Sequence, residues 1–165
     1  FPSDQKIINN WLLQFGLYGM ETLGLLIKLN QAISNQFRYQ VREEPGVQSP
    51  AQTLAQRSGS CRDYATLFIE ACRCLGLAGR FVSGYLHAPE TEAGNASTHA
   101  WAEIYLPGTG WKGFDPTSGV VTSSQHIAVA VARDPEAVPP VSGSFTGLGD
   151  ATPTMRVNVQ VNLLA

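Results

Sequence analysis

Three residues of this sequence have the types and the order of a thiol-based catalytic triad. Cys61, His99 and Asp115 follow one another along the chain. In enzymes of this kind a thiol attacks the substrate, an imidazole serves as its general base, and a carboxylate orients the imidazole. We therefore predict that Cys61, His99 and Asp115 are catalytic, provided that the fold brings them together.

The element that would carry Cys61 is a helix over residues 61–75. Its apolar side chains recur at helical spacing, Ser60 and Asp63 have the spacing of a capping box, and Gly76 follows its end. Cys61 extends the apolar stripe backwards, so its thiol is expected to face the core. The start of a helix offers a partial positive charge and unpaired N–H groups, which favour a thiolate and can bind an oxyanion.

His99 and Asp115 are expected on one β-hairpin, formed by strands at 99–106 and 111–115 around a turn at 107–110. Because both residue numbers are odd, a register whose paired numbers sum to an even value places both side chains on one face. The carboxylate would then fix the imidazole tautomer that leaves the other ring nitrogen for the thiol. Taken singly, a histidine in a strand is more often structural, and an aspartate before proline more often forms a turn.

The rest of the sequence predicts helices before the hairpin and antiparallel strands after the cysteine helix. The predicted helices cover residues 4–15, 20–36 and 50–56, an extended arm covers 37–42, and further strands cover 80–86, 127–133 and 155–163. Residues 134–153 are rich in proline and glycine and are predicted to be a long irregular connection. This order of elements indicates the α+β class.

Length and composition predict a single domain over residues 1–165. The net charge of −2 argues against a nucleic-acid partner, and no apolar run is long enough to span a membrane. Three cysteines do not make a disulfide framework, so a reducing, cytoplasmic location is expected. The chain begins with Phe1, and we expect it to be a piece of a longer protein.

No metal or cofactor is expected. Cys72 and Cys74, together with the scattered His87, His99 and His126, match no standard zinc spacing, and no calcium loop rich in aspartate is present. Cys72 and Cys74 are interpreted as structural cysteines, and His126, which begins a strand beyond the triad, is interpreted as structural too.

Three further residues leave alternatives open. Arg62 opposes the dipole of its helix, so it is expected to pair with a carboxylate, to position the loop before Cys61, or to be solvated. Trp101 and Trp111 could flank a substrate cleft, although aromatic residues in strands more often belong to a core.

The motifs around the triad resemble those of the transglutaminase-like superfamily, and most closely those of its bacterial proteins. They are GSCRDYA at 59–65, THAWAE at 98–103 and GWKGFDPT at 110–117, with further similarity at 46–50 and 83–85. The resemblance covers roughly residues 22–133. It implies a papain-like α+β core in which the cysteine helix packs on an antiparallel sheet, with Cys61 as nucleophile, His99 as base and Asp115 as orienting group.

The resemblance also implies an oxyanion donor upstream of the cysteine. Tyr39 stands at a loosely matching place, where larger transglutaminases have tryptophan. Calcium dependence is not implied, because the acidic loops of calcium-regulated members are not found in this sequence.

The function implied is acyl transfer from an amide or peptide bond through a thioester on Cys61. Water as the acceptor would make a peptidase or amidase, and an amine would make a cross-linking transglutaminase. Hydrolysis of a protein or peptide substrate is favoured for a small bacterial-type member. The other hypothesis is a protein-interaction domain without turnover.

Overall fold

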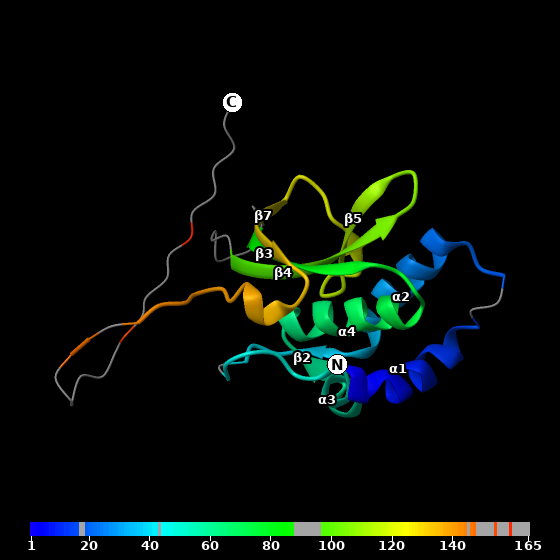
Figure 1. The fold of residues 1–165 in the computed structure, drawn as a ribbon, viewed down its shortest axis with the longest axis horizontal. Helices are drawn as coiled ribbons and strands as arrows, with labels where there is room; N and C mark the ends of the chain where they lie inside the picture. The colour runs from blue at the N-terminus through cyan, green and yellow to red at the C-terminus, as the bar shows by residue number, and fades with distance from the viewer. Residues whose placement is uncertain are drawn as a thin grey trace.

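The computed structural model describes residues 1–16, 19–42, 44–87, 97–144, 146–147, 154 and 159. Within this part of the chain, a β-sheet forms one layer and helices form the other (Figure 1). Helix α4 (Cys61–Cys74) lies between the sheet and the other helices, and it contacts both. The predicted strand at 155–163 falls almost entirely outside the described residues.

The elements before α4 are mostly helical. They are η1 (Pro2–Asp4), α1 (Gln5–Leu12), η2 (Leu13–Phe15), α2 (Thr22–Gln36), β1 (Arg38–Tyr39), α3 (Pro50–Gln56) and β2 (Ser58–Gly59). The predicted helix at 4–15 is thus divided into an α-helix with a 3₁₀ turn at each end, and Gly16 ends it with a positive φ of 61°. The predicted extended arm is reduced to β1, which pairs in parallel with β2.

The main sheet has five antiparallel strands in the order β6-β5-β4-β3-β7. Its strands are β3 (Gly79–Leu86), β4 (Ser97–Leu106), β5 (Gly110–Asp115), β6 (Val120–Val121) and β7 (His126–Ala132). Four of them lie within two residues of their predicted positions. Strands of two residues, such as β2 and β6, are too short to leave an alternating pattern in the sequence.

The core joins α4 to one face of this sheet. Ala100, Ala102 and Ile104 on β4 are at most 1% exposed on the face that α4 covers. The rings of Phe68 on α4 and Phe114 on β5 pack with their centroids 5.5 Å apart. The small alanines allow the helix to approach closely, and this packing sets where the first turn of α4 lies relative to the sheet.

The α+β class predicted from the sequence is confirmed. None of the helices in the described part of the chain has the length and apolar character needed to cross a membrane.

Candidate active site

The first turn of α4 is held by the buried carboxylate of Asp63. It accepts hydrogen bonds from the backbone N–H of Ser60 at 2.8 Å and from the Ser60 hydroxyl at 2.9 Å. The predicted capping box is thus confirmed. It also accepts hydrogen bonds from the Arg42 guanidinium at 2.9 Å and from the backbone N–H of Gln48 at 2.6 Å. Asp63 therefore fastens the preceding loop to the helix start that carries Cys61.

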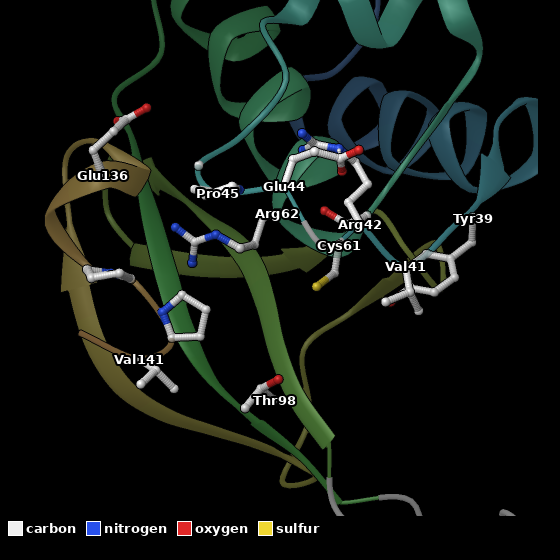
Figure 2. A pocket seen from close by; sticks show the side chains of 14 residues that line it. Tyr39, Val41, Arg42, Glu44, Pro45, Cys61, Arg62, Thr98, Glu136 and Val141 are labelled. Carbon is white, nitrogen blue, oxygen red and sulfur yellow. Dashed lines mark ion pairs between the residues drawn. The ribbon is translucent and has the colours of Figure 1, made fainter. Parts of the chain in front are cut away.

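Cys61 lies at the base of a cleft. Its side chain is 9% exposed, and its sulfur points into a cavity of about 650 Å³ (Figure 2). One wall of the cleft comes from residues 39, 41, 42 and 44–46, and the opposite wall comes from residues 136 and 139–141. The inward direction predicted from the helical stripe is thus observed, and the thiol also faces a space that a substrate could occupy.

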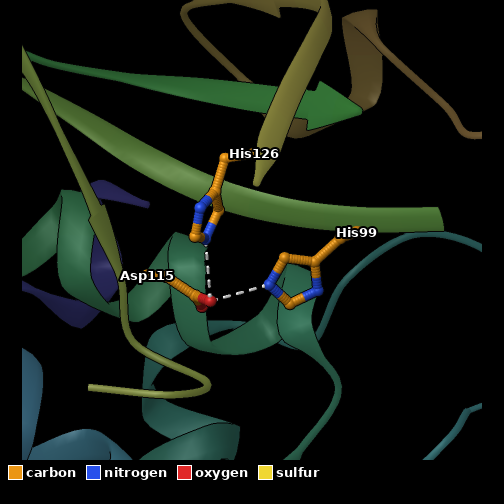
Figure 3. Close-up of side chains that lie close together, drawn as sticks. All are labelled: His99, Asp115 and His126. Carbon is orange, nitrogen blue, oxygen red and sulfur yellow. Dashed lines mark hydrogen bonds and ion pairs between the residues drawn. The ribbon is translucent and has the colours of Figure 1, made fainter. Parts of the chain in front are cut away.

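The hairpin of β4 and β5 brings His99 and Asp115 together. Ala102 pairs with Phe114, so paired residue numbers sum to an even value, as the sequence prediction requires. His99 donates from Nε2 to Oδ2 of Asp115 at 3.0 Å (Figure 3). The backbone N–H of Thr117 donates to the other carboxylate oxygen at 2.9 Å. Both members of the pair are buried.

Cys61 also lies close enough to His99 to raise the pKa of the imidazole. Because its Nε2 is bonded to Asp115, the ring nitrogen left for the thiol is Nδ1. Burial by itself would lower the pKa of His99, but the hydrogen bonds and charges of Asp115 and Cys61 raise it to about 9. The fold therefore brings the three predicted residues into one connected arrangement that favours a protonated imidazole at neutral pH.

The carboxylate of Asp115 is stabilised in its ionised form. Burial would raise its pKa, but hydrogen bonds from His126, His99 and Ser118, together with the charge of His99, hold it well below its usual range. A permanently charged group is thus available beside His99.

Tyr39 also lies close to the thiol. Its strand β1 pairs with β2, so Tyr39 stands beside Gly59, two residues before Cys61. Burial raises the pKa of Tyr39, and the nearby Cys61 raises it further. The structure places Tyr39 beside Cys61, and its role as an oxyanion donor stays a prediction.

Arg62 corrects a sequence expectation. Its guanidinium donates to the backbone carbonyls of Pro135 at 2.7 Å and Val138 at 3.1 Å, and it lies 4.7 Å from the centre of the Phe81 ring. Among the residues that the structure describes, neither a carboxylate nor the loop before the cysteine is its hydrogen-bonding partner. Arg62 instead fixes η3 (Pro135–Ala137) beside the first turn of α4, which forms the far wall of the cleft. The segment is distant in sequence, so local patterns could not reveal this contact.

The two tryptophans do not line the cleft described above. Trp101 is 2% exposed and packs beside His99 and His126. Trp111 stands on the outer side of the sheet, where the Arg80 guanidinium lies 4.2 Å from the centre of its ring.

His126 is the residue of this site that the sequence analysis left out. Its Nε2 lies 3.3 Å from Oδ2 of Asp115, so two imidazoles share one carboxylate oxygen (Figure 3). The contact depends on the pairing of β7 with β3, in which His126 stands opposite Leu86. Nothing in the local pattern around His126 indicates that pairing.

His99, Asp115 and His126 also form a group whose ligand atoms lie within 4.8 Å of one another, close enough to hold a metal ion. The hydrogen bonds argue against that use. The backbone N–H of Ser123 donates to Nδ1 of His126 at 3.2 Å, so a neutral His126 carries its proton on Nε2. Nε2 is the atom that a metal in this group would require without a proton.

Comparisons with known proteins indicate the family of this chain. Residues 20–116 match the profile of the transglutaminase-like superfamily. The Mycobacterium leprae protein ML0607 is 37% identical over 122 residues, which cover 71% of this chain and 42% of the relative.

Two solved structures have a similar fold. A candidate cysteine protease from Cytophaga hutchinsonii superposes with a TM-score of 0.67 at 27% identity, over 83% of this chain and 44% of that protein. The periplasmic domain of TgpA from Pseudomonas aeruginosa superposes with a TM-score of 0.52 at 24% identity, over 72% of this chain and 43% of that domain. The present chain thus spans less than half the length of each of these relatives.

The matched region contains all of α4 and of the β4–β5 hairpin, and the antiparallel sheet packed on α4 is the papain-like architecture that the motifs implied. This chain therefore belongs to the transglutaminase-like superfamily.

Proposed function

We propose that this protein is a cysteine-dependent acyl-transfer enzyme that hydrolyses an amide or peptide bond through a thioester on Cys61. The observation that carries the proposal is His99, which is hydrogen-bonded to Asp115 and lies beside a cysteine at a helix start. The cleft in front of that cysteine supports it, and so does the likeness to a candidate cysteine protease at 27% identity.

The first half of the reaction acylates the enzyme. The Cys61 thiolate attacks the substrate carbonyl carbon, a C–S bond forms, and the carbonyl oxygen becomes an oxyanion. The backbone N–H groups at the start of α4 and the phenol of Tyr39 are the proposed donors to that oxygen. The C–N bond then breaks, His99 delivers its Nδ1 proton to the departing amine, and a thioester remains.

The second half releases the acyl group. Neutral His99 takes a proton from a water molecule, the resulting hydroxide attacks the thioester carbonyl, and the C–S bond breaks. The products are a carboxylic acid and the thiolate of Cys61, beside a protonated His99. Asp115 stays ionised throughout and stabilises the imidazolium in both halves.

Hydrolysis is favoured over amine transfer because the cleft is open to water. Tyr39 and Val41 in its wall are 50% and 80% exposed. A transglutaminase must protect its thioester from water until the amine arrives, and side chains this exposed would give little protection.

A substrate screen tests the proposal. Purified protein is incubated with internally quenched peptide libraries and with glutamine-containing peptides, with and without an added primary amine. We expect cleavage or deamidation that depends on Cys61, and we expect a Cys61–acyl adduct by mass spectrometry after acid quenching. The matched controls are Cys61→Ser and Cys74→Ser. Amine incorporation that outpaces hydrolysis would contradict the preference for water, and equal turnover by the Cys61→Ser variant would contradict the proposal itself.

A further inference from the structure

Asp115 receives more hydrogen bonds than a triad requires. Its Oδ2 accepts from His99 at 3.0 Å, from His126 at 3.3 Å and from the Ser118 hydroxyl at 2.7 Å. The two imidazole side chains are 7% and 4% exposed, and the carboxylate is fully buried. A second histidine, His126, thus contacts the carboxylate that orients His99.

The backbone decides which proton His126 carries. Ser123 directs its N–H at Nδ1 of His126, which must accept it with a lone pair. The neutral ring then has its proton on Nε2 and donates it to Asp115. The contact with Ser123 therefore sets the direction of the hydrogen bond between His126 and Asp115.

We propose that His126 is a positioning residue for the acyl transfer proposed above, a neutral Nε2–H donor that restrains the Asp115 carboxylate at the same oxygen that accepts from His99. The inference rests on that proposed function. Because His126 contributes one Nε2–H donor, the negative charge of Asp115 remains available to the imidazolium of His99. Because His126 does not line the cleft around Cys61, it is expected to affect the chemical step and not substrate binding.

The sheet is shaped to bring His126 to this place. The register between β3 and β7 shifts between Ser83 and Gly84. A Cβ at Gly84 would stand 2.1 Å from the carbonyl oxygen of Ile127 and 2.8 Å from the Trp101 ring. Glycine therefore allows the backbone of β7 and the Trp101 ring to approach β3 together, and His126 packs edge-on against that ring with centroids 5.3 Å apart.

The groups that face His126 are few in the part of the chain that the structure describes. Asp115 and Ser123 bond its two nitrogens, and the rings of His99 and Trp101 lie 6.2 Å and 5.3 Å away. The acidic group among these is Asp115, and the group that can become cationic is His99.

The mutational test compares two replacements of His126. His126→Gln places an amide N–H near the position of Nε2 and keeps a neutral donor, whereas His126→Phe keeps a ring and removes the donor. We expect the Phe variant to lower kcat about tenfold, the effect of losing one hydrogen bond to an ionised group, with KM unchanged. We expect the Gln variant to recover most of kcat. Equal kcat in the wild type and both variants, or a Phe effect confined to KM, would overturn the inference.

A spectroscopic test needs no substrate and no variant. In ¹⁵N-labelled wild-type protein, the ring nitrogens of His126 report the tautomer through their chemical shifts. We expect a protonated Nε2 and an unprotonated Nδ1 at pH 7. A proton on Nδ1, alone or in an imidazolium, would overturn the inference even if the Phe variant does not fold.

The two proposals can fail separately. If wild-type Cys61 reacts with iodoacetamide no faster than a free thiol and His99→Ala leaves that rate unchanged, the proposed function fails. If that reactivity depends on His99 while kcat is the same with and without a donor at position 126, the function stands and the role of His126 fails.

Discussion

Cys61 and Cys72 lie on the same apolar stripe of α4, yet they meet different surroundings. Cys72 is fully buried, and burial raises the pKa of its thiol well above the usual range. Cys61 is nearly as buried but stands in the first turn, where it meets His99, Tyr39 and a cleft. Residue type and burial are therefore nearly the same for the two thiols. What differs is the position at the helix end and the groups that lie beside it.

The largest expected difference between the two cysteines concerns turnover. Cys61→Ala is expected to lower kcat ~10⁶-fold, as removal of a nucleophile does. Cys72→Ala is expected to keep kcat and to lower the free energy of unfolding by about 1 kcal/mol, because it leaves a small cavity in the core. Steady-state kinetics and urea unfolding of both variants check this prediction. A larger loss of kcat in Cys72→Ala than in Cys61→Ala would contradict it.

Replacing the carboxylate should make Cys61 behave more like Cys72. Asp115→Asn removes the charge that stabilises the His99 imidazolium and is expected to lower kcat ~10⁴-fold. The control is Glu21→Gln, an exposed acidic residue on the helical side of the molecule. Comparable losses in the two variants would mean that net charge, not the Asp115–His99 pair, controls the rate.

The histidine beside Cys61 should also make the free energy of unfolding depend on pH. The pKa of His99 is raised from 6.5 to about 9, so the folded protein retains a proton that the unfolded chain releases in this range. The stabilisation of the folded protein by this proton is fully present below pH 6.5 and is lost as the pH rises through about 9. It amounts to at most about 3 kcal/mol.

Urea unfolding of the wild type and of His99→Gln at pH 6, 7, 8 and 9 measures this effect. We expect the free energy of unfolding of the wild type to fall with pH and that of the variant to fall less. Parallel pH curves for the two proteins would contradict the raised pKa.

The smallest expected effect concerns the phenol beside the thiol. Tyr39→Phe is expected to lower kcat by about tenfold, less than the ~100-fold that a buried oxyanion donor supplies, because Tyr39 is half exposed and backbone donors remain. Tyr85→Phe on β3 is the matched control for loss of a phenol. A change in KM alone would assign Tyr39 to substrate binding.

The features that the sequence could predict are local or periodic. The stripe of α4, its Ser60–Asp63 cap and the alternation of β4 and β5 predict where Cys61 points and how His99 meets Asp115. Each of these depends on spacing within one helix or one hairpin, and the structure agrees with all of them.

The features that were missed depend on contacts between distant segments. His126 reaches Asp115 through the pairing of β7 with β3, which places the last strand at the sheet edge beside the first. Arg62 binds the backbone carbonyls of residues 135 and 138. Because every residue has a backbone carbonyl, the sequence does not indicate which ones accept this hydrogen bond. Such contacts follow from the topology of the whole sheet, which spacing rules do not determine.

The central claim is that position in the fold makes Cys61, and not Cys72, the reactive thiol. Site-resolved alkylation by iodoacetamide between pH 6 and 8, followed by peptide mass spectrometry in the wild type and His99→Ala, tests it most directly. We predict that Cys61 reacts faster than a free thiol near neutral pH, that His99→Ala abolishes this advantage, and that Cys72 stays unlabelled in the folded protein. Labelling of Cys61 at the free-thiol rate, unchanged by His99→Ala, would contradict the account.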